Sequence, residues 1–271
     1  MKPEKADIAI PEFPSTVQWI NVPYLPTSTL LGSSVPLVWF WDYCSLNSLR
    51  SLPYLQEWNR RYSDFGLRVI GVHSPQFGFG ADHSLVQDAV NRLGIEFAVA
   101  PDPDFQIWKL YGAEVWPSLY LWDRRGLLRY YQFGEGAYDE TEIAIQELLR
   151  EVDGKAEFPE PMPPLRRTDH PGALVRAPTA HSYLEEDRSG HLVRAGEELV
   201  VRYQAATAAA VLEGGGRVDV IVDGKRRRTI QLDRPRLYKL VESGQHEDHE
   251  LKLFFRDDSH VYAFSFAPGP A

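Results

Sequence analysis

The only cysteine of this chain lies where a strand, a short loop and a helix are expected to meet. Cys44 follows an apolar run, Leu37 to Trp41, which predicts a buried strand, and precedes an amphipathic segment that opens at Ser45. A helix N-terminus offers unpaired N–H groups and a partial positive charge, which both favour a thiolate. The sequence therefore leaves two alternatives for Cys44: a reactive thiol at a helix start, or an inert apolar side chain.

A single cysteine among 271 residues limits the chemistry further. No disulfide can form within one chain, so no catalytic or structural dithiol exists. If Cys44 reacts, it does so as a single-cysteine thiol oxidoreductase or peroxidase that an external thiol resolves. The Pro-x-x-x-Thr/Ser-x-x-Cys segment of peroxiredoxins is absent, because Trp-Phe-Trp-Asp-Tyr precedes Cys44. Whether the chain is an enzyme thus stays open at this point.

Two serines, Ser45 and Ser48, follow the cysteine. Serine is a strong helix N-cap, because its hydroxyl accepts a hydrogen bond from a free backbone N–H of the first turn. No base at the spacing of a catalytic triad accompanies them. We therefore interpret one serine as the cap of the first helix rather than as a nucleophile.

The surrounding elements predict an α/β domain followed by an all-β domain. Apolar runs and helical stripes alternate in the order β-α-β-α-β-α-β-β-α up to residue 152. Four prolines between Phe158 and Pro164 predict a stiff linker, after which short alternating strands favour a β-sandwich. The predicted divisions are an N-terminal lead-in, the α/β domain, the linker and the sandwich, over residues 1–34, 35–157, 158–174 and 175–271.

The segment Phe40 to Leu55 reads F-W-D-Y-C-S-L-N-S-L-R-S-L-P-Y-L. It resembles the active-site segment of the TlpA/ResA/DipZ-like thioredoxin-fold family, of the AhpC/TSA-redoxin type, which includes domains fused to NHL repeats. The resemblance covers about residues 17–150 and implies a thioredoxin-like fold. Residues 237–240 and 261–266 resemble the C-terminal sandwich of DipZ-like proteins, which is similar to a carbohydrate-binding jelly roll.

The family acts by thiol–disulfide exchange, and its two C-x-x-C cysteines fall on Ser45 and Ser48 here. A hydroxyl cannot form a disulfide, so the resemblance implies a degenerate active site. The serines are either natural or engineered to trap a complex. The chain is then a binding or scaffold module, whose former substrate groove is lined by the two serines and by Trp41, Tyr43, Trp116 and Pro117.

The resemblance also places Trp116-Pro117 at the cis-proline loop, which either holds an extended peptide or only shapes the fold. His73, at a predicted strand end, is either an acid–base group or a hydrogen-bonded side chain. His246 and His249 lack zinc-site spacing and are expected in a solvated loop. Alternating Tyr262, Phe264 and Phe266 share one strand face, which favours a sandwich core over an exposed sugar platform.

Composition limits the partners. A formal net charge of −9 gives no indication of nucleic-acid or anionic-membrane binding, and no run reaches the roughly 18 apolar residues of a membrane span. The first residues carry no apolar signal segment, so we expect a cytoplasmic protein. We expect no cofactor and no metal. The expected partners are a peptide or protein at the cis-proline loop and a glycan or protein at the sandwich.

Overall fold

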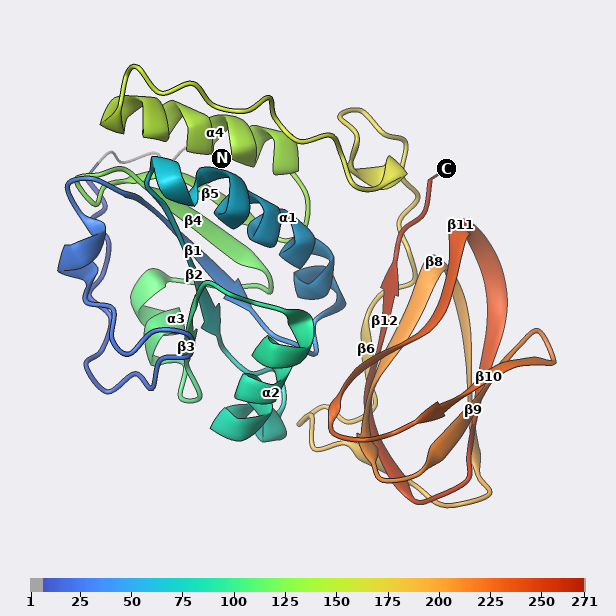
Figure 1. Cartoon of the computed structure of the whole chain (residues 1–271). Helices are drawn as coiled ribbons and strands as arrows, with labels where there is room; N and C mark the ends of the chain where they lie inside the picture. Colours follow the sequence, from blue (N-terminus) through green and yellow to red (C-terminus); the bar gives the residue numbers. More distant parts are fainter. Residues whose placement is uncertain (1–6, 271) are drawn as a thin grey trace. The chain divides into compact units, whose positions relative to one another are not determined.

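The computed structural model describes residues 7–270 and divides into two compact units (Figure 1). The first unit ends at Leu165 and the second begins at Arg166. Each unit has its own sheet, and each is described separately below.

A five-stranded sheet in the order β3-β2-β1-β4-β5 forms the centre of the first unit. β1 pairs with β2 in parallel and with β4 antiparallel. Every residue of β1 is buried, which explains why it is an uninterrupted apolar run rather than an alternating one. This is the thioredoxin-like α/β layout that the resemblance implied. The strands are β1 (Val35–Trp41), β2 (Leu67–His73), β3 (Ala98–Pro101), β4 (Ser118–Trp122) and β5 (Leu128–Phe133).

Four α-helices cover this sheet (Figure 1). As predicted, the Ser45 hydroxyl caps α1, and the Asp82 carboxylate caps α2. Gly94 ends α2 in the left-handed conformation, with φ 64°. The α-helices are α1 (Leu46–Tyr62), α2 (His83–Leu93), α3 (Gln106–Tyr111) and α4 (Tyr138–Val152), and the 3₁₀ turns are η1 (Thr27–Leu30), η2 (Ser63–Phe65), η3 (Gly78–Ala81) and η4 (Arg167–Asp169).

The segments before β1 and after α4 both pack on the first unit. Ile20 and Val99 exchange two backbone hydrogen bonds, so the lead-in extends the β3 edge of the sheet. The chain after α4 runs back along that helix (Figure 1). There the amide of Met162 donates to Glu142 and the amide of Leu165 donates to the Tyr54 hydroxyl, at 3.1 and 2.8 Å.

The second unit is an antiparallel sheet in the order β10-β9-β11-β8-β12-β6, with β7 beside β12. The β9–β10 hairpin turns at Asp223-Gly224, where both residues have the positive φ of a type I′ turn, as the sequence predicts. The strands are β6 (Ser182–Tyr183), β7 (His191–Val193), β8 (Glu198–Gly214), β9 (Arg217–Val222), β10 (Lys225–Gln231), β11 (Arg236–Phe255) and β12 (Ser259–Ala267).

Two pairs of predicted strands are each one long strand. β8 joins 198–204 to 208–213, and β11 joins 237–241 to 251–255. The hydrogen-bonded pairing of β8 with β11 shifts register between Glu242 and Glu247. Such an irregularity bends the paired strands, so both can run from one layer of the sandwich to the other. The predicted solvated loop at His246–Glu250 was therefore wrong, because these residues belong to β11.

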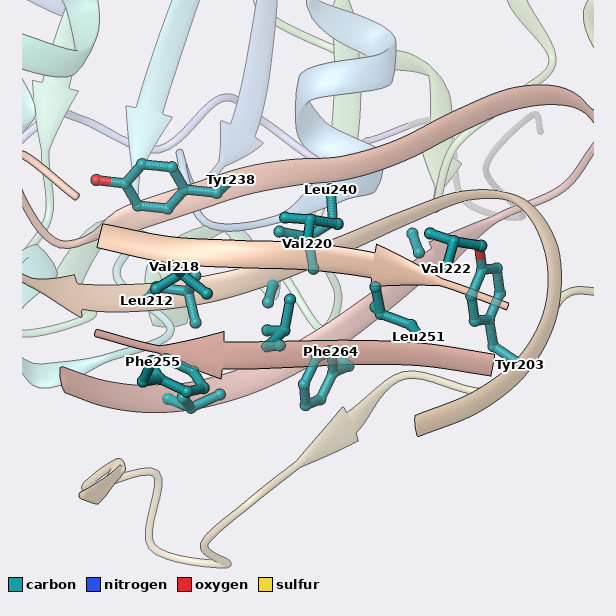
Figure 2. Close-up of a cluster of buried hydrophobic side chains, with 14 of the residues drawn as sticks. Tyr203, Leu212, Val218, Val220, Val222, Tyr238, Leu240, Leu251, Phe255 and Phe264 are labelled. Carbon is teal, nitrogen blue, oxygen red and sulfur yellow. The ribbon is translucent and has the colours of Figure 1, made fainter. Parts of the chain in front are cut away.

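Both arms of these strands contribute to one core (Figure 2). Leu212 comes from the second arm of β8 and Tyr238 from the first arm of β11, whereas Leu251 and Phe255 come from the second arm of β11. Tyr262, Phe264 and Phe266 are 7%, 3% and 7% exposed. Their burial confirms the core interpretation of the alternating aromatics.

Candidate functional site

The carboxylate of Asp42 organises the turn between β1 and α1. Its Oδ1 accepts a hydrogen bond from the amide of Cys44, and its Oδ2 accepts one from the amide of Gln76 at 2.7 Å. Asp42 is 1% exposed. A buried carboxylate thus ties the turn after β1 to the segment that follows β2. Asp42 was not among the predicted site residues, although an aspartate directly after an apolar strand is a signal for such a site.

Both serines use their hydroxyls to build the start of α1. The Ser45 Oγ accepts a hydrogen bond from the Ser48 amide at 3.2 Å, and the Ser48 Oγ accepts one from the Asp42 amide at 3.4 Å. Ser48 is fully buried and Ser45 is 6% exposed. Either hydroxyl would have to leave these contacts to meet a substrate.

Cys44 lies inside the same turn and is 1% exposed. Its backbone amide is the group that Asp42 holds. A reagent can reach a thiol in this position only if the turn opens. This burial favours the inert alternative for Cys44 over the reactive thiol.

The cis-proline loop lies beside the end of β1. Antiparallel pairing of Phe40 with Ser118 places Pro117 alongside Trp41, and the Trp116–Pro117 peptide bond is cis. Of the predicted groove residues, Trp41, Tyr43 and Pro117 are buried, whereas Trp116 is half-buried. Trp116 is therefore the groove residue that presents a side-chain surface.

Two further aromatic residues, which were not among the predicted site residues, join Trp116. The rings of Trp108 and Trp116 lie 4.3 Å apart, and Phe105 meets both rings edge-on. Phe105, Trp108 and Trp116, called the aromatic cluster below, are each half-buried. The indole N–H of Trp116 donates to the carbonyl of Ser74 at 2.8 Å, which fixes the ring.

Asp102 fixes the backbone that carries the aromatic cluster, and it too was not among the predicted site residues. Its carboxylate accepts hydrogen bonds from the amides of Ile107 and Trp108 and from the Ser74 hydroxyl, each at 2.9 Å. Burial raises the pKa of Asp102, and the hydrogen bonds from the α3 amides oppose that rise. The sequence Asp102-Pro-Asp-Phe before a helical stripe was the available signal.

His73 packs between the site and the core. Its ring stacks on Tyr43 with centroids 5.0 Å apart, and its Nε2 is 3.8 Å from the Asp42 carboxylate. Burial lowers the pKa of His73 from 6.5 to about 3, so the imidazole is neutral at physiological pH. Burial also raises the pKa of Tyr43, which stays protonated.

Glu135 bridges two helices at the edge of the site. Its carboxylate lies 3.0 Å from the Arg50 guanidinium on α1 and accepts a hydrogen bond from the Tyr138 hydroxyl on α4 at 2.9 Å.

Within residues 7–270, no group of three or more His, Cys, Asp or Glu side chains is placed to hold a metal ion.

Comparisons with known proteins found one matching family model and several relatives. The family model described as "Thioredoxin like C-terminal domain" matches residues 183–267. Protein DipZ of Mycobacterium tuberculosis (strain CDC 1551 / Oshkosh) is 34% identical over 153 residues, which are 56% of this chain and 22% of DipZ. These similarities confirm the resemblance to the DipZ-like thioredoxin-fold proteins.

Other relatives differ in how much of their length this chain covers. NHL repeat-containing protein 2 of Homo sapiens is 33% identical over 147 residues, which are 52% of this chain and 20% of that protein. The thiol-disulfide oxidoreductase YkuV of Bacillus subtilis (strain 168) is 24% identical over 144 residues, which are 53% of this chain and 96% of YkuV. The chain thus spans about a fifth of the length of DipZ and of the NHL repeat-containing protein.

No helix within residues 7–270 is both long enough and apolar enough to cross a lipid bilayer. The cytoplasmic location stays a prediction.

Proposed function

We propose that this member of the thiol–disulfide oxidoreductase family is a redox-inactive module that binds an extended peptide at the aromatic cluster beside Pro117. The observation that carries the proposal is the chemistry at the start of α1. The hydroxyls of Ser45 and Ser48 are both engaged in the turn and helix cap, and Cys44 is 1% exposed.

Thiol–disulfide exchange needs a thiolate to attack sulfur and a second thiol to resolve the mixed disulfide. Neither serine can supply either step. A lone thiol at Cys44 would have to open the turn that Asp42 holds before it could attack. These contacts favour a binding role over the single-cysteine enzyme, which remains the alternative that the experiment tests.

The aromatic cluster supports the binding part of the proposal. Phe105 has φ 57°, a left-handed conformation that costs a bulky residue of order 1–3 kcal/mol. In that conformation its ring contacts both tryptophans of the cluster. Val115, which precedes Trp116, is 41% exposed and extends the apolar surface. Such surfaces bind extended chains through side-chain burial and backbone hydrogen bonds.

Restoring the dithiol is the decisive redox experiment. We expect the parent chain not to reduce insulin and to react slowly with a thiol reagent. The triple variant C44S/S45C/S48C places two cysteines one helical turn apart, so it should form an intramolecular disulfide and reduce insulin. Insulin reduction by the parent that is lost in Cys44→Ser would contradict the proposal and establish the single-cysteine enzyme.

Peptide binding is tested with reduced, carboxymethylated insulin B chain, which has no thiol to exchange. We expect the parent to bind it and Trp116→Ala to lose most of the affinity. Ile143→Ala is the matched control, because Ile143 is an exposed apolar residue on α4. Absence of binding by the parent, or equal loss in both variants, would contradict a peptide site at the aromatic cluster.

A further inference from the structure

A cavity of about 310 Å³ lies at the carboxyl end of β3, and no function considered so far uses it. Its walls come from the lead-in around Thr16, from the η3–α2 junction at Ala81 and His83, and from the segment that joins β3 to α3. The volume is at the lower end of the range for small-ligand pockets, about 300–1,000 Å³.

Prolines form a large part of the walls of this cavity. Pro14, Pro101 and Pro103 line it, and proline has a carbonyl but no backbone N–H. Among the described residues that line the cavity, none is a lysine or an arginine. Thr16, Gln18 and Gln106 add side chains that can both donate and accept, so the walls leave a ligand's positive charge unopposed.

Two carboxylates give the cavity a negative charge. Asp102 lies at its floor, 3% exposed, where α3 amides and Ser74 already occupy its oxygens. Asp104 is exposed, so its carboxylate is available for a direct ion pair. Since both aspartates line the cavity and no cationic residue does, their charges attract a cation.

His83 adds an acceptor. Its Nε2 lies 3.2 Å from the carbonyl oxygen of Gln18, which can only accept. A ring with one proton must carry it on Nε2 to make this hydrogen bond, and Nδ1 is then an acceptor. Val17 and Ile107 provide apolar wall between these polar groups.

We propose that this cavity binds a primary ammonium group on a short methylene chain. The ammonium would pair with Asp104 over the charge of Asp102, and the methylene groups would pack on Val17 and Ile107. A lysine side chain of a peptide and a free aliphatic diamine share this chemistry.

The test uses the full chain and two probes, one for each source. Cadaverine represents the free diamine, and acetyl-Gly-Lys-Gly-amide represents the peptide. Acetyl-Gly-norleucine-Gly-amide is the uncharged control for the peptide. Calorimetry should detect binding of at least one charged probe that weakens as salt rises. The charged probe that binds more tightly identifies the source of the amine. The proposal would be overturned if the norleucine peptide bound as tightly as the lysine peptide, or if neither charged probe bound.

Two variants locate the site. Asp104→Asn should weaken binding about tenfold, the range of one charge-assisted hydrogen bond. Glu147→Gln removes an equal charge from an exposed position on α4 and should change nothing. Ala81→Phe adds bulk to the cavity wall without changing its charge, and it should abolish binding. If both Asp104→Asn and Ala81→Phe bind like the parent, the amine site is not in this cavity.

Discussion

At the scale of single residues, a few buried polar side chains determine what the site can do. The Oδ2 of Asp42 and the Nε2 of His73 lie 3.8 Å apart, and both residues are 1% exposed. Burial keeps the imidazole neutral, so it does not neutralise the carboxylate beside it. Asp42 instead receives backbone N–H groups, which compensate a buried charge well.

His73 should make the first unit less stable in mild acid. The unfolded imidazole takes up a proton near pH 6.5, whereas the folded one resists until about pH 3. The unfolded state therefore binds more protons as pH falls from 6.5 to 3, and stability falls with it, by about 2 kcal/mol at pH 5.

Urea unfolding followed by tryptophan fluorescence at pH 7 and pH 5 checks this, because all seven tryptophans lie in the first unit. His73→Gln should lose most of the pH dependence that the parent shows. His83→Gln, at a half-buried histidine on α2, should keep it. A parent and a His73→Gln variant with the same pH slope would refute the prediction.

Asp42→Asn should loosen the turn that covers Cys44. An asparagine keeps one acceptor oxygen, but its NH₂ cannot accept the second of the two backbone N–H groups. We expect a loss of about 1–3 kcal/mol in unfolding free energy. Labelling of Cys44 by a thiol reagent requires the turn to open. Its rate should therefore rise about tenfold for each 1.4 kcal/mol by which the free energy of opening falls. Asp64→Asn, at an exposed position, is the control, and unchanged labelling in Asp42→Asn would contradict this account.

At the scale of elements, α1 and α4 are held at their ends by side chains rather than by intrinsic propensity. Ser45 caps α1, and Glu135 connects α1 to α4 through Arg50 and Tyr138. The Arg50 and Glu135 side chains are 11% and 14% exposed, so solvent screens their ion pair little. These contacts position the Ser45–Ser48 turn against the sheet.

Ser45→Ala should cost about 1 kcal/mol of unfolding free energy, since it leaves the Ser48 amide without its cap. Ser45→Gly should cost only a few tenths of that, because glycine allows water to reach the free N–H groups. Denaturation of both variants beside the parent measures the difference. A loss as large for glycine as for alanine would indicate that Ser45 contributes through packing and not as a cap.

At the scale of the whole molecule, each unit closes its own core. The second unit does this with one sheet whose longest strands, β8 and β11, serve both layers. The first unit includes the segment 158–165, which hydrogen-bonds to α1 and α4. That segment overlaps the proline-rich stretch predicted to be a linker at 158–174, a boundary that stays a prediction.

Two truncations test that boundary. A chain that ends at residue 165 keeps the four hydrogen bonds that Pro159, Glu160, Met162 and Leu165 make with the first unit, whereas one that ends at 157 loses all four. At about 1 kcal/mol for each bond, the longer fragment should be more stable by about 4 kcal/mol. Tryptophan fluorescence during urea unfolding compares them. Equal stability would show that residues 158–165 do not contribute to the first unit.

Much of this architecture could be read from local signals. Apolar runs located β1 and β2, and Ser45, Asp82 and Gly94 marked the helix ends where the structure has them. The two long strands of the second unit could not be read in the same way. Polar residues around His246 interrupt the apolar pattern of β11, and only pairing with β8 keeps them in a strand.

The sequence by itself determined that this chain has the thioredoxin-like fold and lacks the sulfur pair, because residue type alone decides whether a disulfide can form. The tertiary structure decided which groups are accessible. It buried Cys44, Trp41 and Tyr43, left Trp116 half-exposed beside Phe105 and Trp108, and brought Asp42 and Asp102 to segments far along the chain. Accessibility and long-range hydrogen bonds arise from packing between distant segments, and no local pattern of residues specifies that packing.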